Sequence, residues 1–275
     1  MLKNSKLSFI GSGAMGTAMI AGLTSKELID PELTTASDPF PTQLEMMAER
    51  YQIHTTQSNI EAVKDKDIII LSIKPQNLVE VGQELRGHIP PDAFVLSIIA
   101  GATITKIGQL LHHYKVVRVM PNTPARVGKG MSVWTATDDV TEIQHQQAKA
   151  ILAALGEEIY VDHEDYMDMA TALSGTGPAY VFLFMEAMID AGVHLGFSRR
   201  VSEQLVFQTI EGSVAFARDS DRHVAELRNM VTSPGGTTAD ALYQLEKGGF
   251  RTVLSKAIWS AYQKSRYLGG LDDNG

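Results

Sequence analysis

No cysteine occurs among the 275 residues of the chain, and positive charge is scarce. Without thiols the protein cannot form disulfides, use a thiol nucleophile or hold a cysteine-ligated metal, and this fits a reducing cytoplasm. The formal net charge is -8, the sequence pI is about 5.5, and lysine and arginine form no cluster. Because phosphate backbones and anionic lipids bind clustered cations, we expect no nucleic-acid or membrane partner.

Long uncharged apolar runs are missing as well. The first apolar run, residues 7–10, is too short for the core of a signal peptide, so we expect the protein to stay in the cytoplasm where it is made. The longest apolar stretch, residues 179–197, contains Glu186, Asp190 and His194, whereas a membrane span needs about 20 mostly uncharged residues. We interpret this stretch as a buried or interface helix.

Several catalytic motifs are absent. The sequence has no G-x-x-x-x-G-K-[ST], H-E-x-x-H or G-x-S-x-G, so phosphate-loop NTPases, zinc proteases and serine hydrolases lack their signatures here. Residues 112–113 and 163–165 are the only histidine-containing clusters that resemble a metal site. Adjacent residues do not face one ligand point and further ligands are missing, so we interpret both clusters as solvated helix ends and expect no metal.

The first half of the chain alternates short β-rich runs with helical segments, which is typical of a parallel sheet wound with helices. The expected strands are residues 6–10, 33–37, 67–73, 93–98, 116–120, 131–136 and 158–161. The run 67–73 is nearly all apolar and β-branched, which fits a central strand covered on both faces. This pattern predicts a Rossmann-type domain over residues 1–162.

The second half has only helical patterns, with glycine or proline between them. The expected helices are residues 164–173, 178–195, 199–218, 222–230, 238–246 and 250–268. Several are apolar on more than one face, which indicates burial against another copy of the chain. We therefore predict an α/β protein whose N-terminal domain is followed by an all-helical domain over residues 163–275.

The most informative motif is G-S-G-A-M-G at residues 11–16, directly after the first expected strand. It matches the dinucleotide fingerprint G-x-G-x-x-G, in which the glycines allow a tight turn, approach of the pyrophosphate and helix–strand packing. Asp38 lies 22 residues after Gly16, near the offset of the residue that meets the adenosine ribose. The alternative is a glycine-rich turn that binds nothing.

Loops that follow the other strands are also candidates, because ligands of open α/β sheets lie at the carboxyl ends of the strands. They are residues 72–75 (S-I-K-P), 99–101 (I-A-G) and 120–124 (M-P-N-T-P). Small residues and prolines suit a backbone that approaches a flat cofactor closely. Ordinary turn chemistry is the alternative for each loop.

Two glycine-rich segments open helices in the second half, and both are candidate sites for an anion such as a substrate carboxylate. Hydroxyls and free N–H groups at a helix N-terminus favour negative charge, although plain helix capping is the alternative. The candidate substrate residues are Ser174, Gly175, Thr176 and Gly177 in the first segment and Ser233, Gly235, Gly236, Thr237 and Thr238 in the second.

Taken in order, IGSGAMG, SIKP, MPNTPA, SGTGPAY and SPGGTTADAL resemble the pyrroline-5-carboxylate reductase family over essentially the whole chain. The resemblance implies hydride transfer from NAD(P)H to the C=N bond of 1-pyrroline-5-carboxylate, which gives L-proline. It also implies a Rossmann domain and a helical dimerisation domain, often in a ring of dimers. The implied cofactor contacts are Ile10, Gly11, Ser12, Gly13, Ala14, Met15, Ser37, Asn59, Ser72, Ile73, Lys74, Pro75, Ala100 and Gly101.

By the same resemblance, the substrate carboxylate sits on the S-P-G-G-T-T segment and Thr238 presents its hydroxyl near the ring nitrogen. A cyclic imine takes its proton from solvent, so the enzyme needs alignment more than a strong acid. Asp38 is not the residue type expected in an NADPH site. An acid at this position accepts hydrogen bonds from the ribose hydroxyls of NAD and repels the 2′-phosphate of NADP, and no arginine is near in sequence. We expect NADP(H) by family, with NAD(H) as the alternative.

Two other functions remain open from the residues. A 3-hydroxyacid dehydrogenase of the 6-phosphogluconate type shares both halves but needs a catalytic lysine in a glycine-rich setting, which Lys247, Lys256 and Lys264 lack. A protein that senses or carries NAD(P) without turnover predicts cofactor binding without pyrroline-dependent oxidation of NAD(P)H.

Overall fold

The structure is a computed structural model that describes residues 2–270. It contains two compact units: one runs to Pro178 and resumes at Ala261, and the other is Ala179–Ser260. The last strand ends at Tyr160, and the chain after it is helical. The first compact unit extends beyond that point because the helix Tyr166–Ala170 packs on the sheet and the end of the last helix contacts that helix through Ser265 and Asp168.

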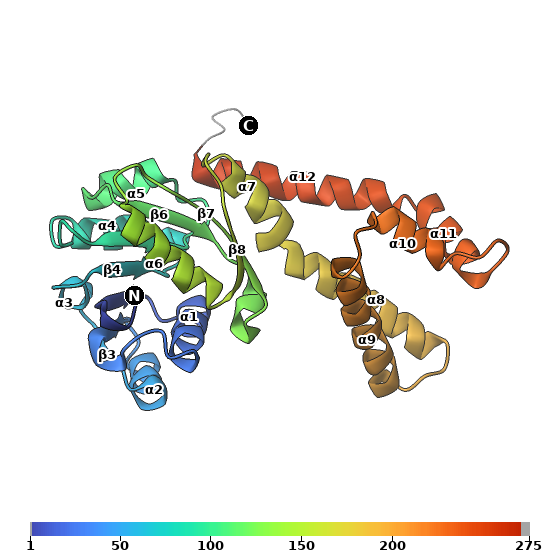
Figure 1. Cartoon of the computed structure of the whole chain (residues 1–275), viewed down its shortest axis with the longest axis horizontal. Helices are drawn as coiled ribbons and strands as arrows, with labels where there is room; N and C mark the ends of the chain where they lie inside the picture. Colours follow the sequence, from blue (N-terminus) through green and yellow to red (C-terminus); the bar gives the residue numbers. More distant parts are fainter. Residues whose placement is uncertain (1, 271–275) are drawn as a thin grey trace. The chain divides into compact units, whose positions relative to one another are not determined.

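The first unit is built on a sheet of eight strands in the order β3-β2-β1-β4-β5-β6-β7-β8, and Figure 1 shows this sheet with helices beside it. The strands are β1 Leu7–Ile10, β2 Thr34–Ser37, β3 His54–Thr56, β4 Ile68–Leu71, β5 Phe94–Ser97, β6 Val116–Met120, β7 Gly130–Ala136 and β8 Gly156–Tyr160. All seven expected strands are present. Strand β3 was not expected, because it is a short polar edge strand without apolar alternation.

One pair of strands differs from the expected parallel arrangement. Strand β7 runs antiparallel to β6, whereas β8 runs parallel to β7. A parallel neighbour requires a crossover of a dozen or more residues, and β6 and β7 are joined by only a short segment that contains the 3-10 turn Thr123–Val127 (η4). The short connection therefore returns the chain antiparallel.

Two apolar cores lie on the two faces of the sheet. In β4, Ile68 and Ile70 face one core while Ile69 and Leu71 face the other, and all four are buried. The first core includes α1 Ala14–Ser25, α2 Pro41–Tyr51 and α6 Glu142–Ala153; the second includes α3 Asn59–Val63, α4 Leu78–Leu85 and α5 Ile104–Leu111. Burial on both faces explains the uninterrupted apolar run of this strand.

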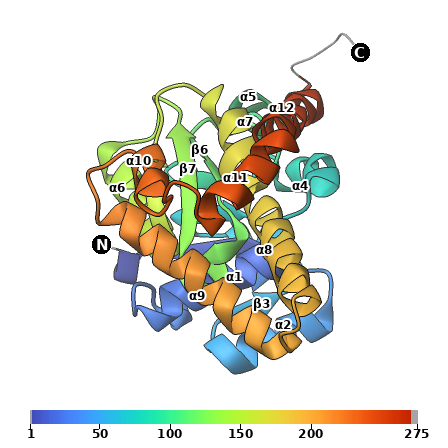
Figure 2. The same ribbon diagram turned by 90° about the vertical axis from the view of Figure 1, so that its right-hand side faces the viewer.

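After the sheet the chain is helical, as expected. The helices are α7 Tyr166–Ala170, a π-helical turn Thr171–Gly175, α8 Gly177–His194, α9 Arg199–Arg218, α10 Val224–Met230, α11 Thr237–Lys247 and α12 Phe250–Gly269. In the second unit α8 and α9 meet near the loop that joins them (Figure 2), where Gly192 lies against Ser202. Tyr166–His194 is long and apolar enough to cross a membrane by length and composition, a test that helices of soluble proteins also pass.

The second unit buries little of its apolar surface. Within Ala179–Ser260 the buried apolar side chains are Ile189, Val206 and Leu227. Many large apolar side chains of the same helices are exposed, including Phe182 and Leu183 on α8. Exposed apolar surface of this extent marks an interaction face.

Candidate active site

The order of the strands places the nucleotide site at the carboxyl end of β1. Strands β2 and β3 lie on one side of β1, and β4, β5 and β6 lie on the other, so the direction of chain progression reverses between β1 and β4. Ligands of open α/β sheets bind at such a switch point. The fingerprint loop, the end of β2 and the loops after β4 and β5 all lie along this edge.

The fingerprint glycines each meet a geometric requirement. Gly11 has φ +90°, and a Cβ on it would lie 2.9 Å from the carbonyl oxygen of Ser72. A Cβ on Gly16 would lie 2.6 Å from the carbonyl oxygen of Gly11. By contrast, a Cβ on Gly13 would meet nothing within 4 Å. The open side of the loop is therefore at Gly13, where the motif expects the pyrophosphate to approach.

The side chain of Asp38 forms hydrogen bonds with neighbouring residues of the protein. Its side chain is buried, and Oδ2 accepts hydrogen bonds from the Ser12 N–H (2.9 Å) and the Ser12 hydroxyl (3.1 Å). Its Oδ1 accepts from the N–H of Phe40 at 3.1 Å. The carboxylate thus supports the fingerprint loop, a role that sequence reasoning did not foresee.

Two further residues support the same loop and were missed from the sequence. The hydroxyl of Thr17 donates to the carbonyl oxygen of Ser12 at 2.8 Å, and the Gln43 amide donates to that oxygen as well. Thr17 lies on α1 and Gln43 on α2, so the loop is held from both helices. In the sequence, the position of Thr17 directly after the motif was a signal for its role, whereas nothing pointed to Gln43.

Ser37 and Asn59, both implied cofactor contacts, are brought together at the end of β2. The Ser37 hydroxyl donates to Asn59 Oδ1 at 2.7 Å, and the Asn59 amide donates to Glu84 Oε2 at 2.7 Å. They adjoin Asp38, so the expected adenosine side of the site is polar.

A hollow of about 370 Å³ opens beside the start of α1. It is lined by Gly13, Ala14, Thr17, Ala18, Ala21, Gln43, Met46, Arg50, Tyr51 and Arg126. The two arginines are far from the fingerprint in sequence, and the fold supplies positive charge that the local sequence does not. Sequence reasoning missed both because they come from α2 and η4.

The loops after β4 and β5 take different positions. Ser72 and Ile73 pack against Gly11, while Lys74 and Pro75 are exposed. Gly101 has φ +70°, and a Cβ on it would lie 3.2 Å from Leu268 Cβ on α12. The second loop is therefore covered by the end of the last helix, whereas Ala100 beside it stays partly exposed.

The S-G-T-G segment differs from the expected open turn. Residues 171–175 continue α7 as a π-helical turn, and the Thr176 N–H donates to the carbonyl oxygen of Thr171 at 2.8 Å. The hydroxyls of Ser174 and Thr176 donate to backbone carbonyls. Asn122, in the loop after β6, donates to the carbonyl oxygen of Ser174 at 3.2 Å. The segment thus adjoins the sheet edge with its hydroxyls already bonded.

The S-P-G-G-T-T segment is the open helix N-terminus that the sequence predicts. Gly235 has φ +68°, and α11 begins at Thr237 with Gly236 as an N-cap that supplies no side-chain hydrogen bond. Among the hydrogen bonds of residues 2–270, none involves the N–H or hydroxyl of Thr237 or Thr238. These free donors suit a carboxylate.

The two histidine-containing clusters contact other parts of the first unit. Residues 2–270 contain no group of three or more His, Cys, Asp or Glu side chains that could hold a metal ion. The interpretation of both clusters as solvated is wrong in part, because His113 is buried at 2.9 Å from the carbonyl oxygen of Ala93 and Glu164 pairs with Arg118. Burial lowers the pKa of His113. Burial also lowers the pKa of Lys66, which precedes β4 and therefore lies at the amino end of that strand, whereas the nucleotide site lies at the carboxyl ends.

Comparison with known proteins matches both halves of the chain. Residues 164–268 match the family described as pyrroline-5-carboxylate reductase dimerisation, and residues 6–101 match NADP oxidoreductase coenzyme F420-dependent. Pyrroline-5-carboxylate reductases of Pseudomonas aeruginosa (39% identical, 96% of each chain covered) and Methanosarcina acetivorans (36%, 98% and 99% covered) are similar. The crystal structure of the Plasmodium falciparum pyrroline carboxylate reductase with NADP bound superposes with a TM-score of 0.90 at 35% identity, covering 98% of this chain and all of that one.

Proposed function

The chain belongs to the pyrroline-5-carboxylate reductase family, NAD(P)H-dependent oxidoreductases that reduce the C=N bond of 1-pyrroline-5-carboxylate to L-proline, and we propose how its residues carry this reaction. The observation that carries the proposal is that the same chain contains both an open fingerprint loop, in the first unit, and a helix N-terminus with free donors at residues 233–238, in the second. A nucleotide site alone serves many reactions.

The residues of the first unit fit a dinucleotide. Gly13 leaves room for a pyrophosphate at the start of α1, and Ser37 and Asn59 offer polar groups on the adenosine side. We assign NADPH as the favoured cofactor, supported by the bound NADP of the Plasmodium relative and by Arg50 and Arg126 beside the fingerprint. When bound, the reduced nicotinamide supplies the hydride.

The residues of the second unit fit the substrate. The free N–H groups at the start of α11 bind the substrate carboxylate, and the Thr238 hydroxyl accepts a hydrogen bond from the protonated ring nitrogen, which fixes the orientation of the ring. The imine is basic enough to be protonated by solvent, so these residues need only to bind and align it. We keep Ser174, Gly175, Thr176 and Gly177 as substrate-side residues beside the sheet edge.

Thr238→Val is expected to lower kcat about 10- to 100-fold, because it removes one oriented hydrogen bond to the reacting ring and keeps the size of the side chain. The Kd for NADPH should stay the same. Thr238→Ser is the matched control and should retain most of kcat, since it keeps the hydroxyl. Equal kcat values for the Val and Ser variants would remove the hydroxyl from the mechanism.

Asp38→Asn is expected to raise the ratio of kcat/KM for NADPH to that for NADH about tenfold, because a negative charge beside the 2′-phosphate is lost. Asn still accepts the Ser12 N–H and so preserves the loop. Asp38→Ala removes that acceptor as well and should weaken both cofactors together. An unchanged ratio in the Asn variant would show that the carboxylate only supports the loop.

The direct test of the function is oxidation of NADPH at 340 nm by the purified protein, with and without 1-pyrroline-5-carboxylate. We expect oxidation only with the imine, with proline as the product. A protein that binds NADPH but does not oxidise it with this imine would instead be a cofactor-binding protein without this activity.

We also propose that the enzyme is a cytoplasmic dimer or ring of dimers without nucleic-acid or membrane partners. The exposed apolar helix faces of the second unit and the matched dimerisation family support self-association. The net charge of -8 supports the absence of anionic macromolecular partners.

A further inference from the structure

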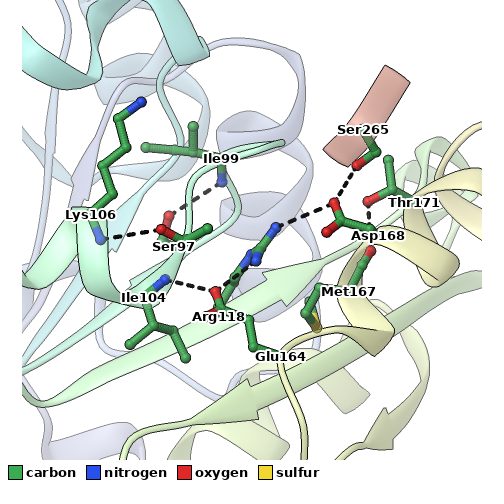
Figure 3. Close-up of polar contacts among 11 residues, drawn as sticks. Ser97, Ile99, Ile104, Lys106, Arg118, Glu164, Met167, Asp168, Thr171 and Ser265 are labelled. Carbon is green, nitrogen blue, oxygen red and sulfur yellow. Dashed lines mark hydrogen bonds and ion pairs between the residues drawn. The ribbon is translucent and has the colours of Figure 1, made fainter. Parts of the chain in front are cut away.

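A buried ionic cluster ties four elements of the first unit together (Figure 3). Arg118 on β6 is 3% exposed, and its Nη1 lies 2.6 Å from Glu164 Oε1 and its Nη2 lies 4.0 Å from Asp168 Oδ1. The Ser265 hydroxyl, on α12, donates to Asp168 Oδ1 at 2.6 Å. Glu164 Oε1 also accepts the N–H of Ile104, at the start of α5, at 2.7 Å. From the sequence, Glu164 was considered only as a metal ligand, and Arg118, Asp168 and Ser265 were not singled out.

The cluster adjoins the loop that follows β5, residues 98–103. The loop's end is fixed by the bond from Ile104 to Glu164, and its beginning by the Ile99 N–H, which donates to the Ser97 hydroxyl at 3.3 Å. Its outer side is covered at Gly101 by Leu268, one helical turn beyond Ser265. The loop is therefore held between the sheet, α7 and the end of α12.

Stability alone is a weak reason for this arrangement. One guanidinium and two carboxylates share the cluster, with Arg118 and Asp168 almost fully buried. Removing charges from water is costly, and apolar residues of similar volume commonly replace such groups without loss of stability. A fixed, directional set of contacts instead defines where the attached loop lies.

The position of this loop indicates what it acts on. The end of β2, with Asp38, marks the adenosine side of the switch point, so the nicotinamide half of a dinucleotide extends over β4 and β5. We propose that Arg118, Glu164, Asp168 and Ser265 are positioning residues that hold loop 98–103 and thereby align the nicotinamide half of the cofactor. This inference rests on the proposed function, because it requires a bound dinucleotide.

The test uses the full-length Ser265→Ala variant, which removes one hydrogen bond from the cluster and leaves its charges unchanged. We expect the Kd for NADPH to rise about fivefold and kcat to fall about tenfold. The Kd for 2′,5′-ADP, which contains only the adenosine half, should not change. Ser25→Ala is the matched control, because the Ser25 hydroxyl donates to a carbonyl at the exposed end of α1. It should behave as wild type.

A second variant guards against a purely structural effect. Glu164→Gln keeps an acceptor for the Ile104 N–H but loses the charge facing Arg118. It should likewise raise the Kd for NADPH and leave the Kd for 2′,5′-ADP unchanged. Equal weakening of both ligands, or no weakening of NADPH, would overturn the proposal. Wild-type protein that binds NADPH but does not reduce the imine would contradict the proposed function, and the two Kd values would still decide the role of the cluster.

Discussion

Gly16→Ala is expected to weaken NADPH binding at least about 100-fold and to lower the melting temperature. The added Cβ would lie 2.6 Å from the carbonyl oxygen of Gly11 and 2.9 Å from the Ser72 hydroxyl. Ser72 donates to that same carbonyl at 2.5 Å, so neither neighbour can withdraw without opening the fingerprint loop. Overpacking of this kind costs about 1–3 kcal/mol, and the displaced loop no longer presents its N–H groups to the pyrophosphate. Fluorescence titration and thermal unfolding measure the two effects.

Gly13→Ala separates the effect on NADPH binding from the effect on the melting temperature. No atom lies within 4 Å of a Cβ at this position, so the variant should melt at the wild-type temperature. Its methyl group nevertheless occupies the side of the loop that the pyrophosphate approaches, and NADPH binding should fall about as far as in Gly16→Ala. Wild-type affinity in Gly13→Ala would mean that the cofactor does not approach this face.

The second large effect concerns the helical unit. Replacement of both Phe182 and Leu183 by glutamate is expected to convert the proposed dimer into monomers or aggregates and to abolish activity. These side chains are 61% and 67% exposed in a unit that buries only three apolar side chains. Burial of each such side chain stabilises an interface by about 1.5–3 kcal/mol, and a two-fold interface buries each of them in both copies of the chain. Sedimentation and light scattering measure the change in mass.

The matched control places the same charges on the first unit. Val79 on α4 and Ile143 on α6 are 48% and 65% exposed, so their double replacement by glutamate adds equal charge to apolar surface outside the helical unit. It should leave both mass and activity unchanged. An unaltered mass for the Phe182 and Leu183 double variant would show that another face of the helices makes the interface.

Most of the fold follows from local pattern. The four-residue strand β4 lies within its expected apolar run, and the later helices begin and end within a few residues of the predicted positions. Strand β3 was missed because three polar residues at an edge carry no periodic signal. The antiparallel direction of β7 was missed although its short connection from β6 was visible in the sequence.

The candidate site divides in the same way. The fingerprint loop and the helix start at Thr237 were predictable, because both depend on glycine conformation and on free N–H groups within a few residues. The supports of the loop were not, since Gln43 and Asp38 reach Ser12 across 31 and 26 residues of chain. A charged residue within the apolar run of β6 was a signal for Arg118, but nothing local identified its partners.

Sequence by itself determined the class of cofactor, the positions of seven of the eight strands and of the later helices, and the open N-terminus at residues 233–238, because each arises from contacts between near neighbours in the chain. Only the tertiary structure decided that the Asp38 carboxylate holds Ser12, that arginines line the hollow beside Gly13, and that Ser265 completes a buried cluster with Asp168. Those arrangements depend on which distant segments the two cores bring together, and long-range packing has no signature in a local pattern.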